Sequence, residues 1–311
     1  MAIDVVIVSY NTADLLRRCL QSIAHTASDR TDWAVYVVDN ASSDGSVDMI
    51  TREFPGMTVI PLESNIGFGP ANNAGAKAGK NPLILFLNSD AELTPGVLNA
   101  MERMLLDDES AIAVGPKLVY PEGSFQPSCR RFPNPLRNFW QLAGLHTKFP
   151  SLFPRAHTWL SQAEHEAAHE VDMVSGACFL IRRTYFESVG GFDDRVFLYE
   201  EELDLFYPTR RRGLSVLYCP AATVIHHHGA SSGEKQGSEL AQYHLFFSKY
   251  LVFEKHYGPW SATITYWTDQ ILYGLSALLN RLRGKQTPAT QLRAKSQKAY
   301  RASKIMQKRQ S

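Results

Sequence analysis

Four short apolar runs in the first hundred residues each end in a polar turn, and helix-like stretches separate them. The runs cover residues 4–8, 33–38, 57–60 and 83–87. Apolar residues recur at helical spacing between Leu15 and Ile23, and the alanine-rich stretch 68–78 stops at Gly79. Strands that alternate with short helices predict an α/β fold with a doubly wound, parallel sheet. In such sheets ligands bind at the carboxyl ends of the strands.

The most informative of these strand ends is Asp90, which follows the apolar run 83–87 directly after Asn88 and Ser89. A carboxylate at this point lies where parallel sheets bind ligands, which favours a role in a site. The alternative is that Ser89 and Asp90 cap a following helix, and Thr94 and Pro95 could equally begin that helix. Both interpretations are open from this segment alone.

Composition is that of a folded globular chain. The 311 residues are 44% hydrophobic, which suffices for one large core or two smaller ones. The N-terminus has no basic stretch before its first apolar run, so we expect no secretory signal. The four cysteines are scattered, which favours reduced thiols in the cytosol over disulfide or zinc spacing.

Charge is distributed unevenly although the formal net charge is only +1. Residues 285–311 hold 8 basic residues and no acidic one, which leaves 24 basic against 31 acidic residues before them. Just upstream, an apolar stripe with Trp267 runs between Ile264 and Leu282, and Asp269 is its only charge before Asn280. This pattern predicts an interfacial helix on anionic lipid rather than a spanning helix. The alternative is a helix packed on the core with a solvated tail, and nucleic-acid binding is disfavoured.

A second group of candidate catalytic and metal-binding residues lies between positions 171 and 233. Residues 171–181 are typical of one apolar strand, and four carboxylates crowd positions 200–204. Like charges this close raise one another's pKa, which can yield a general base at neutral pH. The alternative is that these carboxylates favour a helix N-terminus and face water. Farther on, a strand ends in three histidines from His226, and imidazole with carboxylate suits a divalent cation, although a lone histidine is more often structural.

One rival motif is the sequence His165-Glu166-Ala167-Ala168-His169. It fits the HExxH pattern of zinc peptidases, in which two histidines one helical turn apart hold the metal. Glu187 is the available third ligand, and chance occurrence in a surface helix is the alternative. A nicotinamide-linked oxidoreductase is disfavoured because no glycine-rich turn follows the first strand.

Taken together, the ordered motifs resemble the family 2 glycosyltransferases with the GT-A fold, in their rhamnosyltransferase-like branch. The resemblance spans about residues 3–233. Its blocks are Val-Ser-Tyr-Asn at 8–11, Val-Asp-Asn-Ala-Ser-Ser-Asp-Gly at 38–45, Asn-Ile-Gly-Phe-Gly at 65–69, Asn-Asn-Ala-Gly at 72–75, Leu-Asn-Ser-Asp at 87–90, Ser-Gly-Ala at 175–177, Gly-Gly-Phe-Asp at 190–193, the acidic cluster, and His226-x-x-Gly229.

The resemblance implies an architecture. We expect a doubly wound, mixed but mainly parallel sheet with helices on both faces, followed by a C-terminal helical extension. The expected division is a glycosyltransferase domain at 1–233, an amphipathic membrane-associated segment at 234–284 and a basic tail at 285–311. Within the first, about 1–110 bind the nucleotide sugar, and 111–233 form the acceptor side with the catalytic acid pair.

The resemblance also implies roles for individual residues. Asp39 is similar to the residue that reads the nucleotide base, Asp90 and His226 to the ligands of a Mg or Mn ion on the diphosphate, and Glu202 to the catalytic base, with Glu201 as the alternative. The other implied contacts with the nucleotide sugar are Ser9, Tyr10, Asn11, Asn65, Gly67, Phe68, Asn72, Asn73 and Ser89. The implied acceptor-side residues are Gly176, Ala177 and Asp204.

The function expected from the resemblance is sugar transfer with inversion from a nucleotide diphosphate donor. We expect a dTDP-linked deoxysugar such as rhamnose as the donor, and a lipid-linked or polymeric glycan as the acceptor. The expected place is the cytoplasmic face of the membrane, bound peripherally through the C-terminal segment. The alternative is a non-catalytic protein that binds nucleotide sugars.

Overall fold

The computed structural model describes residues 1–26, 32–149, 151–153, 156–227, 239–285 and 288–308. The chain divides into two compact units, which we describe separately. The first, here called the sheet unit, comprises Met1–Arg131, Trp159–Phe197 and Leu205–Lys235. The second, here called the helical unit, comprises Phe132–Thr158, Leu198–Asp204 and Gln236–Ser311.

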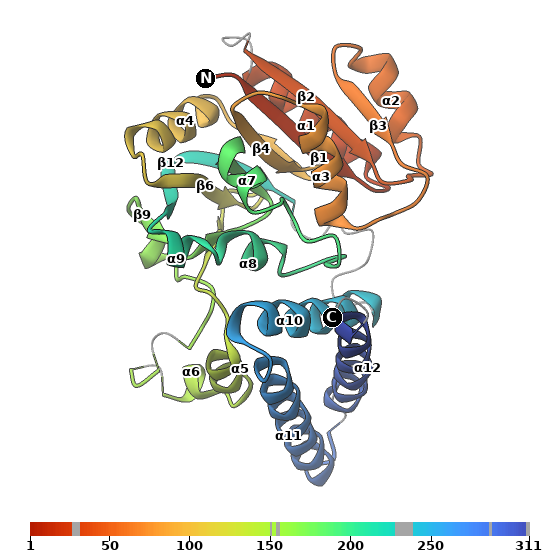
Figure 1. The fold of residues 1–311 in the computed structure, drawn as a ribbon, viewed down its shortest axis with the longest axis vertical. Coiled ribbons are helices and arrows are strands. Elements are labelled where there is room, and N and C mark those ends of the chain that lie inside the picture. Colours follow the sequence, from red (N-terminus) through yellow and green to blue (C-terminus); the bar gives the residue numbers. More distant parts are fainter. Residues whose placement is uncertain (27–31, 150, 154–155, 228–238, 286–287, 309–311) are drawn as a thin grey trace. The chain divides into compact units, whose positions relative to one another are not determined.

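The sheet unit is built on a mixed sheet, shown in Figure 1, whose main order is β3-β2-β1-β4-β11-β6-β12-β5. The strands are β1 Ile3–Ser9, β2 Trp33–Asp39, β3 Thr58–Pro61, β4 Leu83–Asn88, β5 Ala91–Leu93, β6 Ala111–Val119, β7 Phe125–Gln126, β8 Cys129–Arg130, β9 His169–Val171, β10 Met173–Val174, β11 Cys178–Arg182 and β12 Ser215–His226. The first four strands of the order are parallel, and β11 is antiparallel to both of its neighbours. The prediction of a mixed sheet is therefore confirmed.

Helices cover both faces of this sheet because successive strand side chains point to opposite sides. On one face, Val5 of β1 and Leu85 of β4 pack in a core with Leu16 of α1. On the other face, Phe86 stacks against Phe186 of α7, with ring centroids 5.1 Å apart. The helices and the short 3₁₀ helix η2 are α1 Ala13–Thr26, α2 Ser46–Glu53, α3 Phe68–Ala78, α4 Val97–Asp107, α5 Pro135–Leu142, α6 Leu145–Lys148, η2 Ala163–His165, α7 Arg183–Ser188, α8 Glu201–Phe206, α9 Thr209–Arg212, α10 Glu239–Tyr257, α11 Ser261–Leu282 and α12 Ala289–Lys308.

One local prediction is wrong, and one of the two interpretations of Asp90 is excluded. The segment 171–181 is not one strand, because residues 175–177 lie outside β10 and β11. Ser89 and Asp90 do not cap a helix, because β5 follows them at once and α4 begins at Val97 after Gly96. The carboxylate of Asp90 is thus placed by two strands and not by a helix.

In the helical unit, the buried carboxylate of Asp269 links three helices. Asp269 of α11 accepts hydrogen bonds from Lys249 Nζ (2.7 Å) and Tyr250 Oη (2.6 Å) of α10, and from Asn138 Nδ2 of α5 (2.9 Å). A buried charge needs such partners, so Asp269 fixes three helices together. The interruption in the apolar stripe therefore faces inward.

The C-terminal part of the chain is helical. The described residues 239–284 form the helices α10 and α11, and α12 lies within the basic segment 285–311 and packs on both of them. Residues 132–158 also join this unit. In the part of the chain that the structure describes, no helix is both long enough and apolar enough to cross a bilayer.

Candidate active site

The carboxyl ends of β1 and β2 place two polar side chains next to each other. Ser9 and Asp39 are register partners in this parallel pair. The Asp39 side chain is buried, and its Oδ2 accepts a hydrogen bond from Ser42 N at 2.9 Å. Its Oδ1 accepts none from the residues that the structure describes. Because a buried carboxylate oxygen without a donor is costly, Oδ1 is suited to an N–H group of a ligand.

A buried chain of hydroxyl groups joins the ends of β1 and β4. Ser9 Oγ lies 3.0 Å from Thr12 Oγ1, which donates to Ser89 Oγ at 2.9 Å. Sequence reasoning missed Thr12, since a threonine after a strand is too common a signal to identify a network. Ser9 and Ser89 thus hold the two strand ends together, and their contact with a donor stays a prediction.

The turns after β1 and β2 contain non-glycine residues in the left-handed region. Asn11 has φ 54° and Ala41 has φ 67°. Asn11 Oδ1 accepts a hydrogen bond from Ser43 N at 2.8 Å, and Asn11 N donates to Ser42 Oγ at 3.0 Å. Such backbone strain persists only where neighbouring groups hold it, and it is common at ligand sites. Tyr10, between Ser9 and Asn11 in the sequence, is half-buried.

Asn40 holds the loop that precedes α3. Its Nδ2 donates to Asn65 Oδ1 at 2.9 Å and to Gly67 O at 3.2 Å, and its Oδ1 accepts from Ile66 N at 2.9 Å. Gly67 has φ 96°, and a Cβ there would lie 2.5 Å from Phe197 O, so only glycine fits. Asn40 is a second residue that the sequence did not single out, although it follows Asp39 directly.

Two asparagines of α3 are used differently. Asn72 Nδ2 donates within its own helix to Phe68 O at 3.0 Å. Asn73 Nδ2 donates to Phe192 O at 2.8 Å, and Asn73 Oδ1 accepts from Phe192 N at 2.9 Å. Asn73 therefore fixes the turn that contains Gly191. Direct contact of Asn72, Asn73 and Phe68 with a donor stays a prediction.

The structure brings Asp90 and His226 together. Their strands pair in antiparallel register with His226 opposite Ala91, and His227 N donates to Asp90 O at 2.9 Å. His226 Nε2 lies 3.3 Å from Asp90 Oδ1, and both side chains are buried. On its other side, His226 Nδ1 lies 2.9 Å from Gln126 Oε1. The sequence indicated the pair but gave no sign of Gln126.

The predicted acceptor-side residues Gly176 and Ala177 lie between β10 and β11. Ala177 O accepts a hydrogen bond from Asn88 N at 2.9 Å, so this segment borders the end of β4. Asn88 Oδ1 is a buried atom with no donor among the described residues. These two residues thus neighbour the strand end that leads to Asp90, and their role toward an acceptor stays a prediction.

The acidic cluster of the helical unit begins with a strained turn. Tyr199 and Glu200 have φ 69° and 65°, and α8 starts at the next residue. Glu201 is buried, and burial, followed by the charges of Glu202 and Glu200, raises its pKa well above the ordinary value. Glu202 is half-buried. The four carboxylates therefore do not share one solvated surface.

Asp204, the last acid of the cluster, is neutralised by α10. Its Oδ2 accepts a hydrogen bond from Lys255 Nζ at 2.9 Å, and its Oδ1 lies 2.7 Å from His256 Nε2. This pairing separates Asp204 chemically from the glutamates. Its role on the acceptor side stays a prediction.

The zinc-peptidase interpretation of His165, Glu166 and His169 is wrong. His165 belongs to η2, and His169 begins β9, so the histidines do not share a helix face. His165 Nδ1 lies 2.8 Å from Ser161 O, and its Nε2 accepts from Cys129 N at 3.2 Å, so backbone groups occupy both ring nitrogens. Burial accordingly lowers the pKa of His165.

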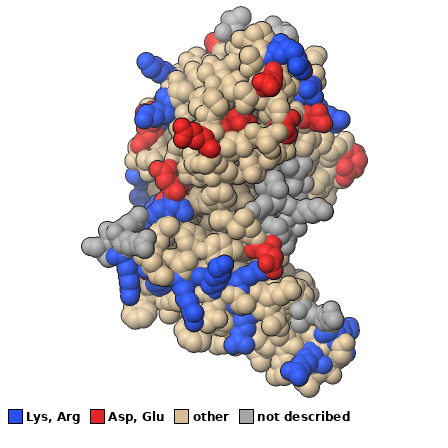
Figure 2. All heavy atoms as spheres, turned by 90° about the vertical axis from the view of Figure 1, so that its right-hand side faces the viewer, with Lys and Arg blue, Asp and Glu red and all other residues tan. Residues whose placement is uncertain are grey.

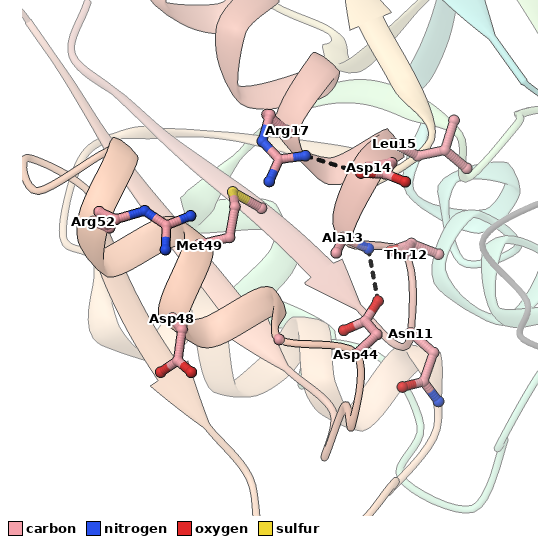
Figure 3. Close-up of a pocket in the computed structure, with 11 residues that line it drawn as sticks. Asn11, Thr12, Ala13, Asp14, Leu15, Arg17, Asp44, Asp48, Met49 and Arg52 are labelled. Carbon is pink, nitrogen blue, oxygen red and sulfur yellow. Dashed lines mark hydrogen bonds and ion pairs between the residues drawn. The ribbon is translucent and has the colours of Figure 1, made fainter.

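A groove of about 750 Å³ lies between α1 and α2, as Figure 3 shows. Of the predicted site residues only Asn11 lines it. Asp44, one of its lining residues, accepts a hydrogen bond from Ala13 N at 2.7 Å, while Arg17 pairs with Asp14. Charged residues that line the groove therefore already bind helix ends or form ion pairs. Neither Asp39 nor Asp90 lines it.

The mixed, mainly parallel sheet with helices on both faces is the GT-A type of glycosyltransferase fold. Residues 4–190 match the family described as Glycosyl transferase family 2, and the chain belongs to this family. It is 32% identical over 90% of its length, and 92% of the relative's, to an N-acetylglucosaminyl-diphospho-decaprenol L-rhamnosyltransferase of Mycobacterium tuberculosis (strain ATCC 25618 / H37Rv). It is 21% identical to the low-salt glycan biosynthesis hexosyltransferase Agl10 of Haloferax volcanii, over 89% of this chain and 81% of that one.

Solved structures agree on the fold. The mannosyltransferase PcManGT from Pyrobaculum calidifontis, in complex with GDP-Man and Mn²⁺, superposes with a TM-score of 0.56 at 19% identity, covering 98% of this chain and 83% of that one. GalNAc-T7 with UDP, GalNAc and Mn²⁺ gives a TM-score of 0.57 at 17% identity, covering 72% and 43%. At these identities the likeness concerns the fold alone.

Proposed function

We propose that the protein transfers a deoxysugar such as rhamnose from a dTDP-linked donor to a hydroxyl of a lipid-linked or polymeric glycan, with inversion. The observation that carries the proposal is the placement of Asp90 and His226 at 3.3 Å beside the end of β4. Similarity to the mycobacterial rhamnosyltransferase over most of both chains supports the choice of sugar and acceptor. Asp39 Oδ1, which lacks a donor among the described residues, suits the ring N–H of thymine or uracil.

The donor atoms of Asp90 and His226 fit a divalent cation, Mg or Mn. An imidazole whose proton is on Nδ1 carries a lone pair on Nε2, and in His226 this atom lies 3.3 Å from Asp90 Oδ1. Two lone pairs opposed at this distance repel, and a cation held by both removes the repulsion. Octahedral ligands at about 2.1 Å lie about 3 Å apart, close to the observed separation.

The described residues hold no ready-made cluster of three or more metal-binding side chains. Asp90 and His226 would thus supply two ligands, and donor diphosphate oxygens and water would complete the shell. When bound, the ion neutralises the charge that develops on the leaving diphosphate. The chain's own task is then to orient the donor and to accept the proton of the incoming hydroxyl.

We assign that proton transfer to Glu202. A carboxylate placed against the acceptor hydroxyl supports one displacement with inversion, without a covalent intermediate. Glu201 keeps its own proton more readily because burial raises its pKa. A neutral Glu201 adds no repulsion against an ionised Glu202, so the two glutamates can differ in role.

The proposal is tested with purified protein, dTDP-rhamnose and a lipid-linked GlcNAc diphosphate acceptor. We expect transfer of rhamnose, and a thermal shift with the donor that is larger when Mn²⁺ is present. Donor at 100 times its Kd stabilises the folded state by about 2.7 kcal/mol. A thermal shift without transfer would favour the non-catalytic alternative, and UDP-sugars acting in place of dTDP-sugars would correct the donor.

We further propose that the helical unit contacts an anionic membrane surface. Of the 17 large hydrophobic side chains that are exposed among the described residues, 15 belong to this unit. In α11 the polarity is inverted, since Thr265, Asp269 and Gln270 are buried while Trp267 and Ile271 are exposed. A soluble helix normally buries its apolar face, so this stripe suits the boundary of a lipid layer.

Charge supports the same surface. The helical unit has 15 basic and 7 acidic residues, whereas the sheet unit has 17 and 24. Figure 2 shows Lys and Arg gathered over the part that contains α10 to α12, with few acids among them. Exposed basic residues at the end of α11 and along α12 are Arg281, Arg283, Lys285, Arg293, Lys298, Arg301 and Lys308. Each such residue near an anionic bilayer contributes about 1 kcal/mol.

We expect the double variant Trp267→Ser, Ile271→Ser to bind phosphatidylglycerol vesicles at least about tenfold more weakly than the wild type. Full burial of a large apolar side chain contributes roughly 1.5–3 kcal/mol to the free energy of binding. The expected loss is smaller than the sum for two side chains because each is only partly in contact with lipid. Vesicle co-sedimentation measures the change. Ile66→Ser is the control, because Ile66 is an exposed apolar residue of the sheet unit. Unchanged binding by the double variant would remove the stripe from the proposal.

A further inference from the structure

Gln126 is a buried polar residue that the reaction chemistry described above does not use. It is the last residue of β7, and its side-chain Oε1 lies 2.9 Å from His226 Nδ1. Its Nε2 is a buried atom with no acceptor among the described residues. A residue needed only for packing at this position would be apolar, because a buried amide with one unmatched group costs about 1–3 kcal/mol.

The sheet register explains how Gln126 reaches the histidine. Gln126 pairs with Leu118 of β6, and Leu118 also pairs with Val224 of β12. Val224 and His226 are two residues apart and therefore point to the same face of the sheet. Gln126 and His226 thus approach across one intervening strand.

We propose that Gln126 is a positioning residue that fixes the Nδ1–H tautomer of His226 and so directs the Nε2 lone pair toward Asp90. The inference rests on the cation site of the proposed function and assigns this residue within it. A carbonyl oxygen can only accept, so the hydrogen bond requires the proton on Nδ1. The same contact also sets the plane of the imidazole ring, which a metal ligand needs.

The consequence is a specific expectation for chemical substitution at this position. Gln126→Met keeps the length and volume of the side chain but offers no acceptor of comparable strength. Gln126→Glu keeps an acceptor toward Nδ1–H and removes the donor group. If the acceptor is what matters, the glutamate variant should act like the wild type and the methionine variant should not.

Two measurements test this on the full-length protein. The first is the Kd for Mn²⁺ in the presence of dTDP, from the electron paramagnetic resonance signal of the free ion. Gln126→Met should weaken binding by about 10–100-fold, the usual effect of losing a group that orients a ligand, and Gln126→Glu should stay within a few-fold of the wild type. Gln141→Met is the control, since the amide of Gln141 donates to Thr158 in the helical unit, and it should leave the Kd unchanged.

The second measurement is the ¹⁵N spectrum of histidine-labelled, metal-free protein. We expect His226 to carry its proton on Nδ1 in the wild type and in Gln126→Glu, and on Nε2 in Gln126→Met. Should the methionine variant not fold, Gln126→Asn, whose shorter amide falls short of the ring, replaces it.

The outcomes distinguish the role of Gln126 from the cation site on which that role depends. Mn²⁺ binding by Gln126→Met equal to that of the wild type, or equal loss in Gln126→Met and Gln126→Glu, would overturn the role of Gln126 and leave the cation site standing. Absence of Mn²⁺ binding by the wild type with dTDP would overturn the cation site itself, and the inference with it.

Discussion

Replacing Asp90 by alanine is expected to lower the rate of sugar transfer by about a thousandfold and to leave the fold intact. The side chain is buried at the end of β4 and faces His226 Nε2, so its loss removes one of the two protein ligands we propose for the cation. Electrostatic neutralisation of a leaving diphosphate contributes several kcal/mol, and each 1.4 kcal/mol is a factor of ten in rate. Steady-state kinetics at saturating donor, with a Mn²⁺ titration, measure the effect.

A matched control lies on the same two strands. Glu92 of β5 and His227, the residue that follows β12, form a second carboxylate–imidazole pair, with Nε2 2.7 Å from Oε1. Glu92 pairs in register with Ile225, whereas His226 pairs with Ala91, so Glu92 points to the face of the sheet opposite to that of His226. Glu92→Gln should therefore change transfer by less than about threefold, within the ±0.5 kcal/mol usual for surface substitutions. Full activity of Asp90→Ala would refute the cation role.

Much of the sheet unit could be predicted because its signals are local. Continuous apolar runs placed β1, β2, β3 and β4 within about one residue of their bounds, and the alanine-rich stretch placed α3 at its observed limits. Parallel strands bring their carboxyl ends to one edge, so the turns after β1 and β2 could be expected at one crevice, and the structure makes Ser9 and Asp39 register partners there. These positions need no knowledge of distant contacts.

The contacts that complete the site could not be predicted from the sequence, because they join residues that are far apart along the chain. The three-residue strand β5 is too short to carry a periodic signal, yet its register with β12 sets Asp90 against His226. Gln126 lies in a two-residue strand and reaches His226 only through the order of β7, β6 and β12. The same limit explains the wrong zinc interpretation, since spacing cannot show that the backbone already occupies both nitrogens of His165.

Glu202→Gln is expected to lower kcat by about 10²–10⁴-fold with little change in donor affinity. Glutamine keeps the size of the side chain but cannot take a proton, and this range is the usual contribution of a general base. Transfer kinetics give kcat, and thermal shift with dTDP-rhamnose gives donor binding. Retention of wild-type kcat would show that another group accepts the proton of the acceptor hydroxyl.

Glu201→Gln is the comparison that decides between the two glutamates. Burial raises the pKa of Glu201, so the folded chain keeps this proton above pH 4.5, where the unfolded chain loses it, and stability falls as pH rises. Glutamine imitates the protonated form, so this variant should keep most of the activity and should unfold at a higher temperature than the wild type at alkaline pH. A loss of kcat in Glu201→Gln as large as that predicted for Glu202→Gln, with Glu202→Gln active, would exchange the roles of the pair. The buried residue would then be the base, and its raised pKa would appear as an alkaline-shifted limb in the pH profile of kcat.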